Sequence, residues 1–315
     1  MQKPVVFVVV GPTAVGKTAM GIRLAQMLGC EIISADARQF YQKMAIGTAQ
    51  PSAAERAQVH HHFVDFLSPT DLFSAGAFAH QAREKLAAMF GGGRNSAVVV
   101  GGSGLYVQAL IEGLNDLPSD LKIRTELNAR LEREGLPALF AELKALDPNH
   151  ADRMDRHNPQ RVVRALEVCL ASGQPFSHFH QPGKRIEPPF EAVWLGLEAP
   201  RDVLDMRIRS RLHQMLAAGW EEEARHLLAY REENALQTVG YREWFAHFDG
   251  DLTRSEMLEK IAIRTRQFAK RQMTWFRRNE AIQWHSHEDV KGLLEKAAEI
   301  CEARNIPLAQ PVSHS

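Results

Sequence analysis

Apolar residues in the first hundred positions fall into short continuous runs that alternate with longer periodic segments. Residues 5–10, 31–34 and 97–100 form short runs bounded by Gly, Pro or Asp, whereas residues 17–28 and 74–90 carry apolar side chains at helical spacing. Continuous apolar runs are typical of strands that are buried on both faces. This alternation predicts an α/β fold with a doubly wound sheet of parallel strands.

The pattern changes after about residue 116. Residues 121–134, 136–146 and 159–171 are charged segments with helical spacing, and a stretch rich in Pro and Gly follows them at 181–189. A strand pattern returns at 192–197, and a helical pattern follows it at 203–217. This order predicts a helical insertion within one α/β core. The expected parts are core residues 1–115 and 186–302, a helical insertion at 116–185 and a flexible tail at 303–315.

Composition narrows the class of protein only a little. The chain carries 38 basic and 38 acidic side chains, so net charge does not indicate a polyanionic partner. Cys30, Cys169 and Cys301 form no CxxC pair, which is typical of a reducing compartment and predicts a cytoplasmic protein. No apolar run reaches the length of a membrane span, and nothing requires more than a monomer.

Residues 11–18 read GPTAVGKT and match the phosphate-loop pattern GxxxxGK[ST] between a predicted strand and a predicted helix. In such a loop, backbone N–H groups and the helix N-terminus point at phosphate oxygens, Lys supplies a positive charge, and the hydroxyl can ligate Mg²⁺. We expect Thr18 to be the metal ligand and Lys17 and Thr18 to take part in catalysis. The expected diphosphate-binding residues are Gly11, Pro12, Thr13, Ala14, Val15, Gly16, Lys17 and Thr18.

An acidic residue follows one of the predicted strands. Enzymes that split nucleoside triphosphates commonly place a second acid after an apolar strand, but the run at 97–100 continues into Gly101 and Gly102. The acid that does follow a strand is Asp36. Asp36 could be a metal-site acid, a general base or a helix cap. The residues therefore leave open whether the chain is an ATP-dependent kinase for a small metabolite or nucleoside, or another kind of enzyme.

Residues 264–278 carry six basic side chains and no acid. On a helix, Arg264, Phe268, Arg271, Trp275 and Arg278 fall along one stripe. The aromatic side chains could belong to the core, with the arginines at a solvated edge. We favour a surface that binds nucleic acid, because cations beside stackable rings suit backbone contact and base stacking.

Three consecutive histidines, His60, His61 and His62, stand shortly before Asp65. Neighbouring side chains on a strand point in different directions, so this run lacks the spacing of a shared metal site. We interpret it as the polar start of a strand.

Together, these motifs and their order resemble the tRNA dimethylallyltransferases, also called tRNA isopentenyl transferases. The motifs are GPTAVGKT at 11–18, ISADARQFY at 33–41, IGTAQP at 46–51, HHFVD at 61–65, FSA at 73–75, GGSGLY at 101–106, NPQRVVRALE at 158–167, VGYRE at 239–243 and TRQFAKRQMTWFR at 265–277.

The resemblance implies transfer of a dimethylallyl group from dimethylallyl diphosphate to N6 of the adenosine on the 3′ side of a tRNA anticodon. It implies that Asp36 is the general base, that Mg²⁺ assists the loop, and that the anticodon stem-loop is the partner. Residues matched to tRNA contacts of the family are Asp36, Ala37, Arg38, Gln39, Ser103, Arg124, Gln160, Arg161, Val162, Val163, Arg164, Gln237, Thr238, Val239, Gly240, Tyr241, Arg242, Thr265, Arg266, Gln267, Phe268, Ala269, Lys270, Arg271 and Gln272.

The chain departs from the usual pattern of this family at three positions. The family commonly has Ser at the position of Ala37, Thr at that of Ser103 and Lys at that of Gln50. Ser103 keeps a hydroxyl, but Ala37 loses a hydrogen-bonding group next to the expected base, and Gln50 loses a charge.

Overall fold

The computed structural model of the chain describes residues 2–114, 117–180 and 188–309. The chain divides into two compact units, which we call the core unit and the helical unit. The core unit joins Met1–Glu112 to Glu187–Ser315, and the helical unit is Gly113–Ile186. The predicted insertion, residues 116–185, falls within the helical unit.

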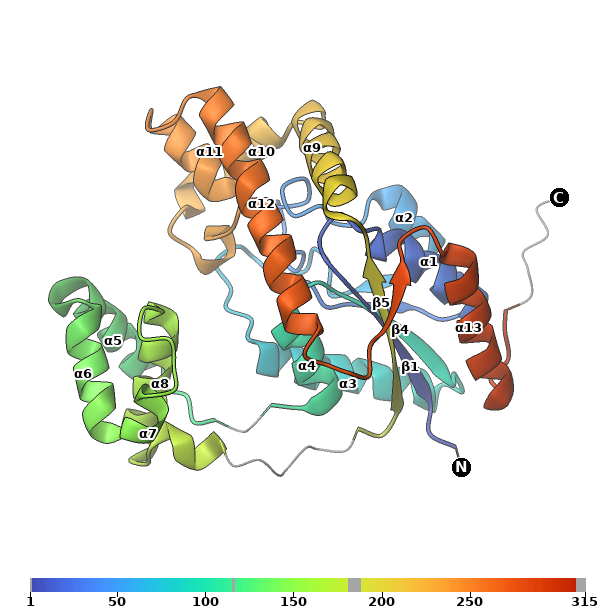
Figure 1. Cartoon of the computed structure of the whole chain (residues 1–315), viewed down its shortest axis with the longest axis horizontal. Helices are drawn as coiled ribbons and strands as arrows, with labels where there is room; N and C mark the ends of the chain where they lie inside the picture. The colour runs from blue at the N-terminus through green and yellow to red at the C-terminus, as the bar shows by residue number, and fades with distance from the viewer. Residues whose placement is uncertain (1, 115–116, 181–187, 310–315) are drawn as a thin grey trace. The chain divides into compact units, whose positions relative to one another are not determined.

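The core unit is built on a sheet of six parallel strands in the order β3-β2-β4-β1-β5-β6 (Figure 1). Every residue of β1 is buried, because the sequence VVFVVV is apolar on both faces of the strand. Val5 pairs with Ser96 on one side and with Glu191 on the other. The strands are β1 Val5–Val10, β2 Ile32–Ser34, β3 His61–His62, β4 Ser96–Val100, β5 Glu191–Glu198 and β6 Gln283–Ser286.

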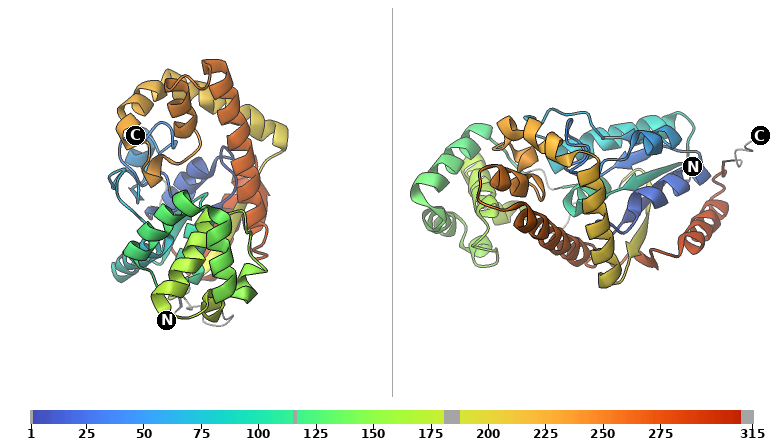
Figure 2. Two further views of the ribbon diagram at one scale, coloured as in Figure 1. Left: turned by 90° about the vertical axis from the view of Figure 1, so that its left-hand side faces the viewer. Right: turned by 90° about the horizontal axis from the view of Figure 1, so that it is seen from above.

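Helices pack on both faces of this sheet, which confirms the predicted doubly wound α/β fold. One hydrophobic cluster contains Phe78 and Leu110, and a second contains Leu24 and Leu293. The longest helix of the described part, α12, is drawn in dark orange in both views of Figure 2. The helices are α1 Lys17–Leu28, α2 Ala53–Gln58, α3 Ala75–Gly91, α4 Gly104–Glu112, α9 Arg201–Ala217, α10 Trp220–His226, α11 Tyr241–Phe248, α12 Arg254–Phe276 and α13 Val290–Ala303, with 3₁₀ turns at Leu228–Tyr230 and Asn234–Leu236.

The helical unit has a small core of its own. Leu127, Leu139, Leu143 and Leu166 are buried together there. The three longer helices begin at the residues that the sequence predicts. The helices are α5 Leu121–Glu134, α6 Leu136–Leu146, α7 Pro148–Ala151 and α8 Pro159–Ser172, followed by a 3₁₀ turn at Phe176–His180. Across the ranges described in both units, no helix is long and apolar enough to cross a membrane.

The predicted loose tail begins with residues that make specific contacts. Ile306 is buried in the same cluster as Leu293, the Ala309 amide donates to the Met27 carbonyl at 2.8 Å, and Arg304 forms an ion pair with Glu191 at 2.5 Å. Residues 303–309 thus contact the rest of the core unit, and the flexibility of the tail at 303–315 stays a prediction. Residues 310–315, and residues 181–187 of the predicted Pro- and Gly-rich segment, lie outside the described residues.

Candidate active site

The phosphate loop connects the carboxyl end of β1 to the first turn of α1. Gly11 and Gly16 have φ values of 146° and 109°, and a Cβ on Gly11 would lie 2.4 Å from the Leu197 carbonyl oxygen. Only glycine suits this combination of conformation and close approach. Open α/β sheets bind ligands at the carboxyl ends of their strands, near the point where the strand order reverses. Since β1 lies between β4 and β5, the loop occupies such a place.

Lys17 is partly buried at the start of α1. Its Nζ donates to the Pro12 carbonyl oxygen at 2.8 Å. Burial lowers the pKa of Lys17 to about 8, while the nearby charge of Asp36 acts in the opposite direction and Arg211 adds to the lowering. An anion bound at the loop would favour the charged amine.

Two arginines of α9 face the phosphate loop, and the sequence analysis missed both. Arg207 Nη1 donates to the Val15 carbonyl oxygen at 2.9 Å. Arg211 lies one helical turn further on, where burial lowers its pKa. Their spacing of four on a predicted helix indicates a shared face, but no sequence pattern distinguishes them from Arg209. Arg209 instead pairs with Glu259 at 3.0 Å.

Asp36 follows β2 and begins a turn rather than a helix, which excludes the helix-cap interpretation. Its Oδ1 accepts a hydrogen bond from the Arg38 amide at 3.1 Å. Burial raises the pKa of Asp36 above its usual range, although the Arg38 amide and the charge of Lys17 oppose the rise. A carboxylate with a raised pKa is a stronger proton acceptor, which suits a general base.

Two side chains hold the turn that carries Asp36, and both are positions where the chain departs from the family pattern. Ser103 Oγ accepts from the Ala37 amide at 2.9 Å, so the hydroxyl contacts the backbone next to Asp36. Gln50 Nε2 donates to the carbonyls of Gln39 and Tyr41 at 3.1 and 2.8 Å. These bonds fix the backbone that follows Asp36, without help from a side chain at position 37.

The phosphate loop and Asp36 open into one cavity of about 1210 Å³ in the core unit. Arg211 of α9, Arg242 of α11 and Arg264 of α12 also line it, so basic groups face it from three helices. The predicted site residues that line the cavity are Thr13, Ala14, Gly16, Lys17, Thr18, Asp36, Ala37, Arg38, Gln39, Ser103, Gln237, Thr238, Val239, Arg242, Thr265, Gln267, Phe268 and Arg271.

Several residues that the resemblance assigned to tRNA contacts are buried, and this narrows the predicted surface. Their side chains are part of the packing that supports the surface, so they do not offer a face to an RNA in this structure. The buried residues are Val162, Val163, Gly240, Tyr241, Ala269 and Gln272. Among them, Gln272 links two loops: its Oε1 accepts from the Thr13 amide at 2.8 Å, and its Nε2 donates to the Gly102 carbonyl at 2.9 Å.

Some of the six basic side chains at 264–278 have acidic partners in other parts of the core unit. Arg264 pairs with Glu243, which is 1% exposed. Arg266 pairs with Asp205 at 3.0 Å, and Arg277 pairs with Glu198 at 3.1 Å. Acids from β5, α9 and α11 thus neutralise half of the six cations, although the segment 264–278 itself contains no acid.

The two aromatic residues of the stripe, Trp275 and Phe268, have different surroundings. Trp275 covers Gly104, where a Cβ would lie 2.2 Å from the Trp275 ring, so this indole belongs to the packing of the core unit. Phe268 is 38% exposed, lines the cavity and lies 5.8 Å below the Arg271 guanidinium. Of the six cations at 264–278, those that form no ion pair with another described residue are Lys270, Arg271 and Arg278.

In the helical unit, Arg124 and Arg164 converge on one buried carboxylate. Glu167 is fully buried and accepts from Arg124 at 2.8 Å and from Arg164 at 2.9 Å. Burial acts to raise the pKa of Glu167, but the two arginines outweigh it and the pKa is lowered. Both guanidinium groups are partly exposed, and Gln160 and Arg161 are exposed at the start of α8. Arg164 and Glu167 of the motif at 158–167 therefore have a structural role within the helical unit.

The three histidines begin the edge strand β3, as expected. His61 Nδ1 lies 2.8 Å from the Val59 carbonyl oxygen, and His62 Nε2 lies 2.6 Å from Glu31. Burial lowers the pKa of both imidazoles. These contacts give each ring a role in local packing.

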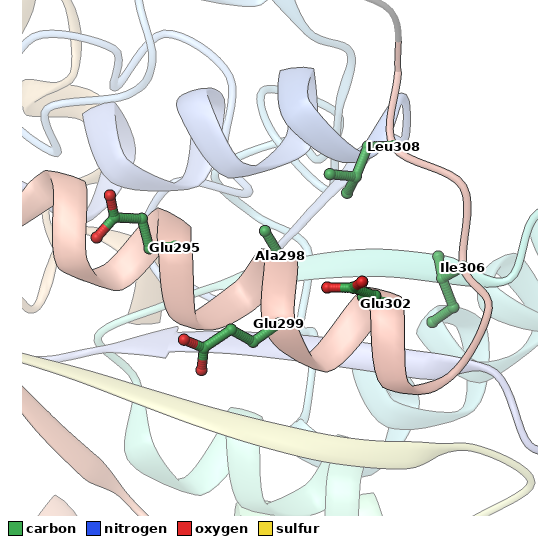
Figure 3. A pocket seen from close by; sticks show the side chains of 6 residues that line it. All are labelled: Glu295, Ala298, Glu299, Glu302, Ile306 and Leu308. Atoms are coloured by element: carbon green, nitrogen blue, oxygen red, sulfur yellow. The ribbon is translucent and has the colours of Figure 1, made fainter.

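A second hollow, of about 590 Å³, lies along α13 (Figure 3). Glu295, Glu299 and Glu302 line it together with Ala298, Ile306 and Leu308. Three carboxylates would repel a diphosphate. The cavity at the phosphate loop is therefore the candidate active site.

Comparison with known proteins identifies the family of the chain. A sequence model described as IPP transferase matches residues 39–279. The tRNA dimethylallyltransferase 2 of Porphyromonas gingivalis is 42% identical over 292 residues, which cover 92% of this chain and 97% of that protein. The tRNA dimethylallyltransferase of Christiangramia forsetii is 44% identical over 282 residues, which cover 89% of this chain and 93% of that protein.

A solved structure is similar over the same length. The full-length tRNA isopentenylpyrophosphate transferase from Bacillus halodurans has a TM-score of 0.71 and 34% identity, and the match covers 96% of this chain and 98% of that one. The resemblance inferred from the motifs is confirmed, and the chain belongs to the IPP transferase family.

Proposed function

We propose that the chain transfers the dimethylallyl group of dimethylallyl diphosphate to N6 of the adenosine on the 3′ side of the anticodon in tRNA, and releases diphosphate. The observation that carries the proposal is a single cavity with a phosphate loop and a carboxylate of raised pKa in its wall. Relatives named tRNA dimethylallyltransferase match along nearly their whole length. A tRNA substrate would place the activity in the cytoplasm.

Different side chains hold the leaving group and accept the proton of the nucleophile. The phosphate loop, Lys17 and Arg211 hold the diphosphate, which leaves with the electron pair of the C1–O bond as that bond breaks. The N6 amine of adenosine attacks C1 and gives up one proton. Asp36 accepts that proton, because a neutral carboxylic acid is favoured where burial disfavours the carboxylate.

Magnesium fits this arrangement. Thr18 lines the cavity, and nowhere in the described part do three His, Cys, Asp or Glu side chains gather as a metal cluster. A cation bound here would take most of its ligands from diphosphate and water, as Mg²⁺ commonly does in sites that bind phosphates. Its chemical contribution would be to neutralise charge on the departing diphosphate.

The kinase alternative lacks a supporting observation. β4 ends in Val100 and continues into Gly101 and Gly102, so no acid follows the strand where triphosphate-splitting enzymes commonly need one. Gly102 instead contacts Gln272. The relatives quoted above carry the names of transferases that act on tRNA.

The proposal is tested by incubating purified protein with radiolabelled dimethylallyl diphosphate, Mg²⁺ and unmodified tRNA. We expect label at the adenosine next to the anticodon and release of one diphosphate for each transferred group. A tRNA with guanosine at that position serves as the control. Absence of label in every tRNA, or transfer of phosphate from ATP to an acceptor, would contradict the proposal.

The pH dependence should report on Lys17. Because its pKa is about 8 in the free protein, the amine is charged below that pH and loses its proton above it. We expect kcat/KM for dimethylallyl diphosphate to fall by up to about tenfold per pH unit above pH 8. Lys17→Arg should start lower but stay flat to higher pH, since a guanidinium keeps its charge. A wild-type profile that stays flat to pH 10 would contradict this assignment.

The unpaired cations at 270–278 should bind tRNA. We expect Arg271→Glu and Arg278→Glu each to weaken tRNA binding, and to lower the slope of log K against log salt concentration by about 0.7 per lost phosphate contact on a single strand. Arg23→Glu on α1 is the matched control, because Arg23 is exposed and has no acidic partner within the described ranges. Equal slopes in all three variants would assign α12 a purely structural role.

A further inference from the structure

One wall of the cavity, the loop at residues 46–50, is held from behind by Glu223 of α10. The amides of Ile46 and Gly47 each donate to the Glu223 carboxylate at 2.8 Å. The Tyr241 hydroxyl donates to the same carboxylate at 2.6 Å. Hydrogen bonds to an ionised acceptor are the strong ones, so three donors on one carboxylate make a firm attachment.

Packing leaves this loop no room to move toward α10. The Trp220 and Tyr241 rings meet edge to face with centroids 6.1 Å apart. A Cβ on Gly47 would lie 2.2 Å from Trp220 Nε1 and 2.5 Å from the Tyr241 hydroxyl oxygen. A Cβ on Gly240 would lie 2.4 Å from the other edge of the Trp220 indole. The loop is therefore seated by shape as well as by charge.

The same loop is bonded to the turn that carries Asp36. Gln39 Nε2 donates to the carbonyls of Thr48 and Ala49 at 3.2 and 2.9 Å. Gln50 Nε2 returns a hydrogen bond to the Gln39 carbonyl at 3.1 Å. The Gln39 amide in turn donates to the Asp36 carbonyl at 3.1 Å. Hydrogen bonds thus connect α10 to the 46–50 loop, and the loop to the turn that carries Asp36.

We propose that Glu223 is a positioning residue for the transfer reaction: it fixes the 46–50 loop, and through Gln39 and Gln50 it sets where the Asp36 carboxylate stands in the cavity. Glu223 itself does not line the cavity, so it acts through the backbone it binds. The inference rests on the proposed function, because it assigns Asp36 the role of base. It adds a residue that none of the sequence motifs contains.

A merely structural role would have a different signature. A carboxylate that only stabilises the fold would, when replaced, lower the melting temperature and the active fraction, and the remaining enzyme would work normally. Loss of a positioning residue instead lowers the reaction rate of the folded enzyme, because a small displacement of the base takes it out of line with the amine. Phosphate binding should not change, since the described bonds of Glu223 do not involve the phosphate loop.

The experiment compares Glu223→Gln with Glu222→Gln, the same change one residue earlier on α10. Glu222 is exposed and makes no hydrogen bond or ion pair in the described structure. We expect Glu223→Gln to lower kcat by about tenfold or more, with KM for dimethylallyl diphosphate within about twofold of wild type. Tyr241→Phe, which removes one donor of three, should give a smaller loss, and Glu222→Gln none.

A second readout does not depend on activity. Hydrogen exchange of the Ile46 and Gly47 amides should speed up in Glu223→Gln and stay unchanged in Glu222→Gln. The acid limb of the kcat profile should also move to lower pH if the Asp36 turn loosens toward solvent, with Lys17, Arg38 and Arg211 as the other charges that face the carboxylate.

Two results would overturn the inference. The first is wild-type kcat in folded Glu223→Gln. The second is a loss of activity that follows only the fraction of unfolded protein, with an unchanged pH profile. Failure of the proposed function is a separate outcome, because wild-type protein would then transfer no dimethylallyl group, while the exchange measurement would still test the attachment of the loop.

Discussion

Replacement of Asp36 by asparagine is expected to lower kcat for dimethylallyl transfer by about 10²- to 10⁴-fold. Asparagine keeps an oxygen that can accept from the Arg38 amide, so the turn should survive, but the amide cannot take the proton of the N6 amine. Single-turnover transfer of radiolabel to tRNA, with both substrates saturating, measures this loss directly. Binding of dimethylallyl diphosphate should remain within about threefold of wild type, because the phosphate loop is untouched.

The same variant should change the pH profile of the reaction. In the wild type, burial raises the pKa of Asp36, so the rate rises with pH as the carboxyl group loses its proton and falls as it is protonated. Asp36→Asn should lose this acid limb. Near-normal turnover in Asp36→Asn, or an acid limb that persists, would show that another group takes the proton.

Replacement of Lys17 by methionine is expected to lower kcat/KM for dimethylallyl diphosphate by about 10²- to 10³-fold. Lys17 supplies a positive charge at the loop. In the variant, this charge no longer stabilises the bound substrate or the departing diphosphate. Calorimetric titration with inorganic diphosphate and steady-state transfer kinetics separate the two losses.

The stability of the Lys17→Met variant provides the control. Burial lowers the pKa of Lys17 to about 8, which means that the surroundings disfavour its charged form. An apolar side chain of similar length should therefore not lower the melting temperature of the ligand-free protein. Loss of activity together with loss of folding would contradict the interpretation, as would diphosphate binding equal to wild type.

The sequence predicted the parts of the fold that depend on local pattern. β1 and α1 begin and end as expected, because a run of β-branched residues, a glycine-rich turn and a periodic segment act within a short stretch of chain. α12 begins at Arg254, well before the basic segment, and Thr253 and Glu256 form a capping box at its start. The edge strands β3 and β6 are too short to give a periodic pattern.

The candidate site was predictable where chemistry lies in consecutive residues. The phosphate loop and Asp36 belong to this class. The partners of α12 do not, since Arg264 meets Glu243 and Arg277 meets Glu198 only after the chain has folded. A charge count within one segment cannot detect such pairs. The role of Glu223 could not be predicted for the same reason, because its partners Ile46 and Gly47 are far from it in the sequence.

The pairing of β1 bears on how the chain folds during synthesis. β1 lies between β4 and β5, and the close approach of Gly11 to Leu197 braces the phosphate loop against β5. The whole helical unit is translated between these partners. A nascent chain that ends before β5 therefore has β1 as an unpaired apolar edge, which is a surface prone to aggregation. The contact of Gly11 with Leu197 can form only after β5 has been synthesised.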